Sequence, residues 1–339
     1  MSKKCFKIVV LASADDKECL TMLNHLPNGA SVVAKGKDLE EIKNCDPEFS
    51  KAECLLVVSG NSLNLSSVIR EMPHLKWIHG IFAGLDHMRS SEFDSCNEKG
   101  VFVTNAKGIF SSSLAEWVMG AIWYFNKDIQ RLNHNKANKF YDRYTVGEIR
   151  GKTMGIIGYG DIGCSCAKLA KAYGMRVIAH RRRPELSFND PLLEAVYGNQ
   201  DMNKVVEEAD YLVIAAALTP STDKMIGKEQ FEVAKKGQVI INVGRGKLID
   251  EEELIIALEK KEKIQAAALD VFAVEPLPND SKLWTLPNVL LSPHNADMTE
   301  GFRHSSVKFF TENCSNYLNY LESGNFDTMK NVVNPKEGY

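Results

Sequence analysis

The sequence has few of the features that mark membrane-spanning, polyanion-binding or disulfide-stabilised proteins. Its longest apolar run, 211–218, falls far short of the roughly 20 residues that a membrane-spanning helix requires. Its 41 Lys and Arg residues nearly balance its 44 Asp and Glu residues, which leaves a formal net charge of −3. A surface without a strong excess of positive charge does not favour nucleic acid or a membrane surface as the main partner.

The cysteines give no sign of a disulfide framework. The eight cysteines show no framework spacing, and no C-x-x-C pair occurs among them. A chain of 339 residues can bury a full core without disulfides. The basic N-terminus leads into a short apolar run with no h-region of signal-peptide length, so we expect a first strand there. These features together favour a reducing compartment and a cytoplasmic location.

The length suggests about two domains, and short apolar strands alternate with amphipathic helices along almost the whole chain. Continuous apolar strands alternating with helices indicate parallel sheets that are covered on both faces, which predicts an α/β fold. A polar and mixed segment at 127–151 resembles a connection between domains. Strands are expected at 7–12, 31–34, 55–59, 77–79, 101–104, 153–158, 176–180, 211–216, 238–243, 266–271 and 289–291.

One predicted helix, within 111–125, is apolar on both faces. Leu114 and Val118 lie on one face, while Met119 and Trp123 make the other face apolar too. A helix that is apolar all round has to be buried on both sides. Two explanations stay open: a central core helix, or a helix shared with a second subunit, which would make the protein a homodimer.

A glycine-rich segment at 153–163 reads T-M-G-I-I-G-Y-G-D-I-G. Gly158, Gly160 and Gly163 directly follow an apolar strand and open a helix, which is the context that a G-x-G-x-x-G dinucleotide motif requires. The first glycine permits a tight turn, the second lets a pyrophosphate approach the backbone, and the third allows close helix packing. Free N–H groups at the helix start then face the anion. The alternative is a glycine-rich turn that binds no ligand.

The next strand ends in H-R-R-R-P at 180–184, with no carboxylate. An NAD-binding site places Asp or Glu about here to hold the ribose 2′-hydroxyl. Arginine can instead grip a 2′-phosphate through two hydrogen bonds. We therefore expect Arg181 and Arg182 to favour NADP(H) over NAD(H), with a solvated basic turn as the alternative explanation.

Three later segments each place one ionisable residue at the carboxyl end of a strand, the edge where open α/β sheets bind ligands. They are Arg245 in I-N-V-G-R-G, Glu275 in A-L-D-V-F-A-V-E-P-L-P and His294 in S-P-H-N-A. Taken alone, each has an ordinary explanation: a surface ion pair, a turn residue before proline, and a buried structural histidine. Taken together, in this order after the glycine loop, they indicate a catalytic site.

These segments and the glycine loop resemble the D-isomer-specific 2-hydroxyacid dehydrogenase family, and within it the glyoxylate/hydroxypyruvate reductase-like (2-ketoacid reductase) branch. The resemblance covers nearly the whole chain and includes H-G-I-F-A-G-L-D-H, V-T-N-A-K-G, L-A-E-W, L-T-P-S-T and L-W-T-L-P-N-V. It implies two doubly wound parallel-sheet domains with a cleft between them. These are a flavodoxin-like substrate domain of residues 1–104 and 296–339 and a Rossmann dinucleotide domain of residues 105–295.

The resemblance also implies roles for the residues named above. His294 would protonate the ketone oxygen during hydride transfer and act as the base in reverse, which suits a group that titrates near neutral pH. Glu275 would orient His294, and Arg245 would bind the substrate carboxylate and polarise the carbonyl group. Backbone N–H groups of Ala83 and Gly84 would hold the other side of that carboxylate.

Further cofactor contacts are implied by the same motifs, and no residue is assigned to a metal. The implied function is NADPH-dependent reduction of a small 2-keto acid, glyoxylate, hydroxypyruvate or a bulkier one, to the D-2-hydroxy acid. The alternatives are an NAD-linked D-2-hydroxyacid dehydrogenase and a dinucleotide-sensing, corepressor-like scaffold. Asp270 is assigned to the nicotinamide carboxamide, although by itself it is equally well explained as a cap of its loop. The other implied contacts are Asp161, Ile162, Ala216, Ala217, Thr222 and Val243.

The chain departs from the common pattern of the family in three places. Arg181 replaces the acid that reads NAD, and Gly244 precedes the arginine where a small hydroxyl residue or Ala is frequent. Asn295 and Asp297 flank Ala296, where the family often has a glycine soon after the histidine. The last two departures concern the outer part of the substrate pocket, whose lining residues are not assigned by the resemblance. Candidates for its lining, with core packing as the alternative, are Ile81, Phe82 and Trp284.

Overall fold

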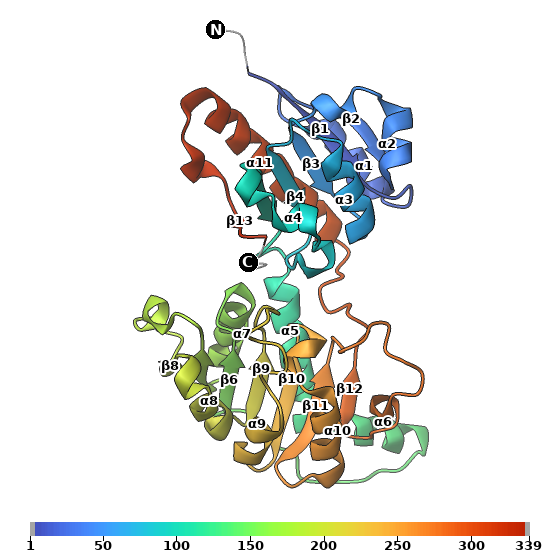
Figure 1. The fold of residues 1–339 in the computed structure, drawn as a ribbon. Coiled ribbons are helices and arrows are strands. Elements are labelled where there is room, and N and C mark those ends of the chain that lie inside the picture. Colours follow the sequence, from blue (N-terminus) through green and yellow to red (C-terminus); the bar gives the residue numbers. More distant parts are fainter. Residues whose placement is uncertain (1–3, 336–339) are drawn as a thin grey trace. The chain divides into compact units, whose positions relative to one another are not determined.

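The computed structural model describes residues 4–335, which form an α/β protein with two parallel-rich sheets (Figure 1). This confirms the fold class predicted from the sequence. The chain divides into two compact units, Met1–Ile109 with Glu300–Tyr339, and Phe110–Thr299. The boundaries expected from the sequence, 104/105 and 295/296, lie a few residues away from these. In the described part of the chain, no helix has the length and apolarity needed for a membrane crossing.

The first unit holds the six-stranded sheet, in the order β13-β5-β4-β3-β1-β2. All its strand pairs are parallel except that of β13 with β5. Side chains of β1 alternate between two cores, because successive residues of a strand point to opposite faces: Val9 faces one core and Ile8 the other. The strands are β1 (Phe6–Leu11), β2 (Ala30–Gly36), β3 (Cys54–Val57), β4 (Trp77–Gly80), β5 (Phe102–Asn105) and β13 (Val332–Val333).

Helices cover both faces of this sheet. One core receives buried side chains from α2, α3 and α4, and the opposite core receives them from α1 and α11. The last helix buries a stripe that includes Val307, Phe310, Cys314 and Tyr317, as its apolar spacing predicts. The helices are α1 (Lys17–Met22), α2 (Leu39–Cys45), α3 (Ser62–Arg70), α4 (Ser91–Asp94) and α11 (Phe302–Ser323).

The second unit holds a seven-stranded, fully parallel sheet in the order β12-β11-β10-β9-β6-β7-β8. The chain passes from β6 to β7 and β8 on one side, and then returns to place β9 on the other side of β6. Open α/β sheets bind ligands at such a reversal. The strands are β6 (Thr153–Ile157), β7 (Arg176–His180), β8 (Ala195–Tyr197), β9 (Tyr211–Ile214), β10 (Gln238–Asn242), β11 (Ile264–Leu269) and β12 (Val289–Leu291).

Helix α5 carries the sequence that is apolar on both faces. It packs along α7, and its Leu114, Val118 and Met119 are buried, whereas Trp123 is 36% exposed. The core explanation therefore accounts for most of the helix. The helices of this unit are α5 (Ser111–Asn126), α6 (Ile129–Ala137), α7 (Asp161–Ala172), α8 (Met202–Glu208), α9 (Lys228–Val233) and α10 (Glu251–Lys260).

The polar segment 127–151 contains one element that the sequence did not predict, the helix α6. Residues 140–149 follow it without helix or strand. The Arg131 guanidinium of α6 pairs with Asp142 and lies 4.0 Å from the ring centre of Tyr144, which ties this stretch back to the helix.

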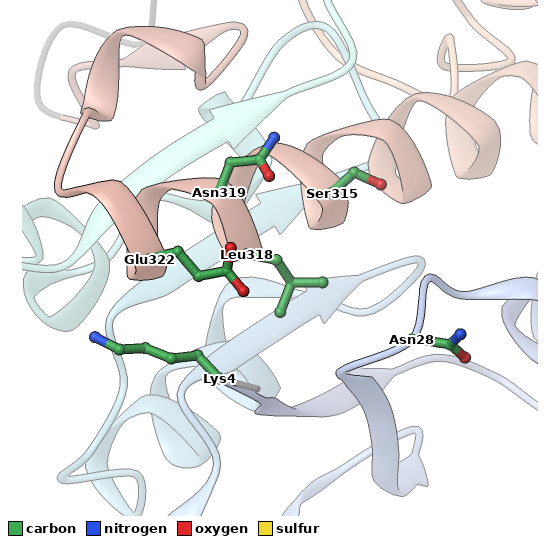
Figure 2. Close-up of a pocket in the computed structure, with 6 residues that line it drawn as sticks. All are labelled: Lys4, Asn28, Ser315, Leu318, Asn319 and Glu322. Carbon is green, nitrogen blue, oxygen red and sulfur yellow. The ribbon is translucent and has the colours of Figure 1, made fainter. Parts of the chain in front are cut away.

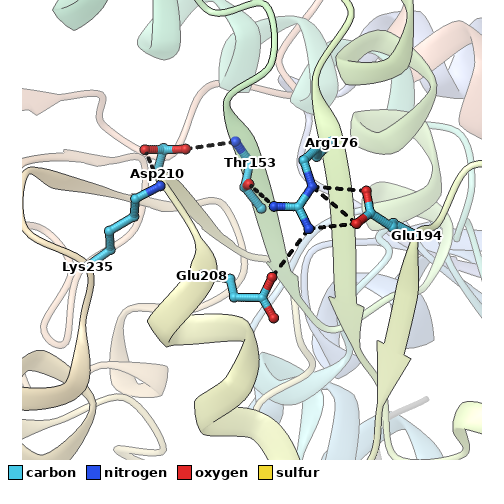
Figure 3. A network of polar contacts seen from close by, with 6 residues as sticks. All are labelled: Thr153, Arg176, Glu194, Glu208, Asp210 and Lys235. Atoms are coloured by element: carbon cyan, nitrogen blue, oxygen red, sulfur yellow. Dashed lines mark hydrogen bonds and ion pairs between the residues drawn. The ribbon is translucent and has the colours of Figure 1, made fainter.

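A polar network fastens the amino ends of three neighbouring strands in the second unit (Figure 3). Arg176, at the start of β7, bonds to both carboxylate oxygens of Glu194 and also reaches Glu208 and the Thr153 hydroxyl. The Thr153 N–H at the start of β6 donates to Asp210, just before β9, at 2.8 Å. Exposed ion pairs contribute at most about 1 kcal/mol each. The network therefore links neighbouring strands at their amino ends, which is the edge of the sheet opposite to the candidate site residues.

Candidate active site

The glycine loop connects β6 to α7 at the carboxyl edge of the second sheet. Gly158 has φ +94°, and a Cβ there would lie 2.5 Å from the backbone of Ala216. Its N–H donates to the carbonyl oxygen of His180 at 3.0 Å. Only glycine meets both conditions, since other residues rarely adopt this conformation. Gly160 is the N-cap of α7. The first N–H groups of a helix have no partner within the helix, and those of α7 lie at this loop.

The loop that follows β7 carries the predicted arginines. The Arg181 N–H donates to the Tyr197 carbonyl oxygen at 3.0 Å, and its Nη1 donates to Ser187 Oγ at 2.5 Å. Arg182 is exposed. The structure thus places the Arg181 side chain on a buried hydroxyl group and the Arg182 side chain at the surface, and both residues directly follow the strand.

Arg245 follows β10 in a tightly packed turn. The Asn242 side chain bonds to the turn twice, accepting from Gly244 N–H at 3.0 Å and donating to the Arg245 carbonyl oxygen at 3.0 Å. A Cβ at Gly246 would lie 1.8 Å from the carbonyl carbon of Phe272, so no other residue fits there. The sequence G-R-G therefore fixes where the arginine leaves the sheet.

His294 and Glu275 form a direct pair, with 2.8 Å between Nδ1 of the ring and Oε2 of the carboxylate. The other Glu275 oxygen accepts from Phe272 N–H at 2.9 Å. Because Nδ1 is bonded to Glu275, Nε2 is the nitrogen that can exchange a proton with a ligand. The His294 side chain is 41% exposed, so that exchange is open.

The charges around this pair explain its pKa values. The hydrogen bond to Glu275 raises the pKa of His294 above its ordinary value, with burial opposing the rise. For Glu275, burial favours the neutral acid, but the bonds from His294 and Phe272 outweigh it and lower the pKa of the carboxyl. The positive charge of Arg245 lowers the pKa of both groups. The structure thus brings together the three residues that the sequence singled out.

Asp270 holds the turn that carries His294. This residue is 1% exposed, and its carboxylate accepts hydrogen bonds from Ser292 Oγ and from the N–H groups of Asn295 and Ala296 at 3.1 and 3.2 Å. The Asp270 carbonyl oxygen also accepts from His294 N–H at 2.8 Å. These bonds keep His294 at φ +53°, a conformation that costs a non-glycine residue about 1 kcal/mol. The loop-capping explanation of Asp270 therefore describes the bonds that its carboxylate makes.

The remaining predicted cofactor residues lie along the same edge. Asp161 and Ile162 are the first residues of α7, and Val243 directly follows β10. Thr222 folds the loop after β9, because its hydroxyl accepts from Thr219 N–H at 2.8 Å and donates to the Ala217 carbonyl oxygen at 2.7 Å. The backbone of Ala216 is the one that a Cβ at Gly158 would meet, so Ala216 lies against the glycine loop.

Ala83 and Gly84 belong to the first unit, in the loop after β4. The buried Asn105 side chain donates to the Ala83 carbonyl oxygen at 2.6 Å, and Ala106 N–H donates to that of Phe82 at 2.9 Å. The loop is thereby braced against β5. Of the pocket candidates, Ile81 is 3% exposed and lies in a core of the first unit, Phe82 packs against both of that unit's cores, and Trp284 is 53% exposed.

Several supporting residues were not identified from the sequence. Asn242 and Ser292 stand inside the quoted motifs, so their places beside Arg245 and His294 were the signal that could have identified them. Asp190 accepts a hydrogen bond from Tyr159, 31 residues away in the chain, and no local pattern marks it.

A surface pocket of about 210 Å³ lies in the first unit, between α11 and the residues that precede β1 and β2. Figure 2 shows the side chains that line it. Its lining is Lys4, Asn28, Ser315, Leu318, Asn319 and Glu322. None of the predicted site residues lines this pocket, so it is separate from the site at the strand ends. Among residues 4–335, no group of three or more His, Cys, Asp and Glu side chains is placed to hold a metal ion.

Comparisons with known proteins find similar sequences and structures. The family model "D-isomer specific 2-hydroxyacid dehydrogenase, NAD binding domain" matches residues 119–296. Glyoxylate/hydroxypyruvate reductase B of Enterobacter sp. (strain 638) is 33% identical over 310 residues, which cover 87% of this chain and 91% of that protein. D-3-phosphoglycerate dehydrogenase of Methanocaldococcus jannaschii is 34% identical over 312 residues, which cover 91% of this chain but only 56% of that longer protein.

Solved structures show the same fold. A D-isomer specific 2-hydroxyacid dehydrogenase from Xanthobacter autotrophicus Py2, in complex with NADPH and MES, superposes with a TM-score of 0.81. The two chains are 24% identical, and the match covers 99% of this chain and 100% of that one.

Proposed function

Because the chain belongs to the D-isomer specific 2-hydroxyacid dehydrogenase family and is an NAD(P)-dependent oxidoreductase, we propose that it reduces a small 2-keto acid to the D-2-hydroxy acid with NADPH. The substrate class is glyoxylate, hydroxypyruvate or a bulkier 2-keto acid. The observation that carries the proposal is the 2.8 Å pair of His294 and Glu275 with the charge of Arg245 beside it.

The residues around the glycine loop fit a dinucleotide. Helix α7 starts directly after Gly160, and a Cβ at Gly160 would meet nothing within 4 Å in the described structure, so the helix start is open to an anion. When bound there, the reduced cofactor supplies the hydride that the ketone carbon accepts. Gly158, Gly163, Asp161 and Ile162 would frame its phosphates.

His294 moves the proton in this proposal. Reduction of a ketone places negative charge on its oxygen, and a charged imidazole that donates from Nε2 neutralises that charge as it forms. Glu275 keeps the ring in one orientation and favours its charged form. In the reverse direction the same nitrogen accepts the proton of the hydroxyl group.

Arg245 binds and polarises the substrate. Its planar guanidinium can hold a carboxylate through two hydrogen bonds. The tight G-R-G turn fixes the backbone from which this side chain extends, and its positive charge acts on both His294 and Glu275. The roles of Ala83 and Gly84 in carboxylate binding, and of Asp270 at the carboxamide, remain predictions from the family resemblance.

The cofactor preference rests on the loop after β7. Arg181 and Arg182 stand where an acid would read NAD, and Arg181 is already held by Ser187. Arg182→Asp should raise the KM for NADPH about tenfold and leave the KM for NADH nearly unchanged, because only NADPH carries the 2′-phosphate. Equal effects on both cofactors, in initial rates with each, would refute phosphate recognition by Arg182.

We also propose that the protein is a cytoplasmic homodimer that associates through the 111–125 region. The exposed Trp123 of α5 supports the interface, and Phe140 and Tyr141 in the following segment are 61% and 92% exposed. Exposed free thiols at Cys5 and Cys45 suit a reducing compartment. Light scattering on the purified protein tests the dimer, and a monomeric mass at micromolar concentration would contradict it.

The test of the activity is the loss of NADPH absorbance with a panel of 2-keto acids, repeated with NADH. Oxidation of NADPH by at least one small 2-keto acid, faster than that of NADH, is the expected result. Faster turnover with NADH would favour an NAD-linked dehydrogenase. Binding of the dinucleotide without turnover of any 2-keto acid would favour a sensing scaffold.

A further inference from the structure

The loop 181–190 is attached at both ends to a single residue, Tyr159, which stands between the first two glycines of the phosphate loop. At the start of the loop, Tyr159 N–H donates to the carbonyl oxygen of His180 at 3.1 Å. At its end, the Tyr159 hydroxyl donates to Asp190 Oδ2 at 2.9 Å. The arginine loop is therefore closed onto the phosphate loop by one side chain and its own backbone.

Tyr159 has the properties of a fixed anchor. The residue is 5% exposed, so its ring has little freedom to move. Burial, followed by the hydrogen bond to Asp190, raises the pKa of the phenol above its ordinary value. The hydroxyl therefore keeps its proton and remains a donor to the carboxylate, a hydrogen bond of the stronger, charge-assisted kind.

Within the loop, Ser187 passes this attachment on to Arg181. Asp190 N–H donates to the Ser187 carbonyl oxygen at 3.1 Å, and Ser187 Oγ accepts from Arg181 Nη1 at 2.5 Å. Ser187 is 5% exposed, so the guanidinium is bonded to a buried and immobile partner. Because the N–H groups of a guanidinium form a rigid planar fork, a hydrogen bond at one nitrogen restricts the directions in which the others can point.

The bonds of Asp190 also explain why an acid is present in this loop. A free carboxylate near the adenosine ribose would favour NAD and repel a 2′-phosphate. Here Oδ2 is bonded to the Tyr159 hydroxyl, and Oδ1 accepts from Leu192 N–H at 2.9 Å. The carboxylate is thus engaged with the protein itself, in a structural contact.

We propose that Tyr159 is a positioning residue for the selection of NADPH over NADH, and that it acts through Asp190 and Ser187 on Arg181. The inference rests on the proposed function, which assigns the arginines of this loop to the 2′-phosphate. NADH lacks that phosphate, so its binding depends on the glycine loop and not on the direction of Arg181. Release of the loop end weakens the binding of NADPH selectively.

The test measures the Kd of NADPH and of NADH by fluorescence titration of the full chain, for the wild type, Tyr159→Phe and Tyr211→Phe. Tyr211 is a matched control: it is also 5% exposed, and its hydroxyl accepts one hydrogen bond, from Asn126 at 3.0 Å, near the start of β9. We expect Tyr159→Phe to weaken NADPH binding about tenfold and NADH binding less than about twofold. Tyr211→Phe should leave the ratio of the two Kd values unchanged.

The route through Asp190 has its own test. Asp190→Ala should change the Kd ratio at least as much as Tyr159→Phe, because it removes the bond from Leu192 N–H as well as that from Tyr159. The double variant should change the ratio no further than Asp190→Ala, because the bond between Tyr159 and Asp190 is already absent there. Additive effects would contradict the route. A melting curve shows whether each variant is folded, and Ser187→Ala, which releases Arg181 without altering the phosphate loop, should show the same selective loss if Tyr159→Phe fails to fold.

The outcomes separate this inference from the function on which it rests. If the wild type binds NADH as tightly as NADPH, the proposed cofactor preference is wrong, and the inference falls with it. If the wild type prefers NADPH but Tyr159→Phe keeps that preference or weakens both cofactors equally, the positioning role alone is overturned.

Discussion

His79 in β4 of the first unit and His294 after β12 of the second unit have opposite surroundings. His79 is fully buried, its Nδ1 lies 2.6 Å from Thr104 Oγ1, and burial lowers its pKa to about 3. His294 is partly exposed and bonded to a carboxylate, and its pKa is raised. One imidazole is kept neutral inside a core, and the other is kept ready to carry a proton.

The difference follows from the partner that each strand end supplies. The Thr104 hydroxyl accepts from Trp77 Nε1 at 2.8 Å, so it is free to donate to His79, and this pairing requires no charge. Glu275 offers His294 a charge as well as an acceptor. A histidine therefore becomes a candidate proton donor when a carboxylate accompanies it at an open edge, and a structural residue when burial is not compensated by charge.

Among the substitutions that leave His294 in place, removal of the Arg245 charge is expected to have the largest effect. Arg245→Ala should lower kcat/KM for the 2-keto acid by about 100-fold, since one donor to developing negative charge is worth about 3 kcal/mol. Arg245→Lys should recover only part of the loss, because an ammonium group cannot form the two parallel bonds. Steady-state kinetics provide the measurement, and full activity in Arg245→Ala would overturn the assignment.

A smaller effect, which depends on pH, is expected when the negative charge of Glu275 beside His294 is removed. Reduction requires charged His294, so the rate should fall as the pH rises through the raised pKa of this group. Glu275→Gln keeps the shape of the side chain but removes the charge. The falling limb of the profile of kcat/KM against pH should therefore move to lower pH, with a loss of about tenfold near neutral pH. An unchanged profile would contradict the role of the pair.

The effect that is smallest near neutral pH concerns stability at the first histidine. The folded pKa of His79, about 3, lies below the unfolded value near 6.5, so the unfolded chain binds the proton first. The neutral ring contributes fully to the free energy of unfolding above about pH 6.5. Below that pH, this contribution falls by about 1.4 kcal/mol for each pH unit. His79→Phe should flatten this acid dependence of the unfolding free energy, measured in urea. Parallel losses in wild type and variant would show that other groups cause them.

Gly158, Arg245 and His294 could be placed at the carboxyl edge of the second sheet because each stands in a short segment that directly follows a predicted strand. The catalytic and cofactor-binding roles of these residues stay predictions. The three-residue strand β8 was missed because its residues are only half-buried and carry no clear alternation. The bond from Tyr159 to Asp190 was missed because it joins distant segments through one hydroxyl group.

The most direct test of the catalytic account is a single turnover with NADPH already bound, comparing the wild type with His294→Ala. Binding of NADPH to the variant should be normal, because His294 is not assigned to the cofactor. Oxidation of the bound NADPH by a 2-keto acid that the wild type reduces should be slower by a factor of about 10² to 10⁴, the usual contribution of a positioned acid. Hydride transfer at the wild-type rate in His294→Ala would contradict the account.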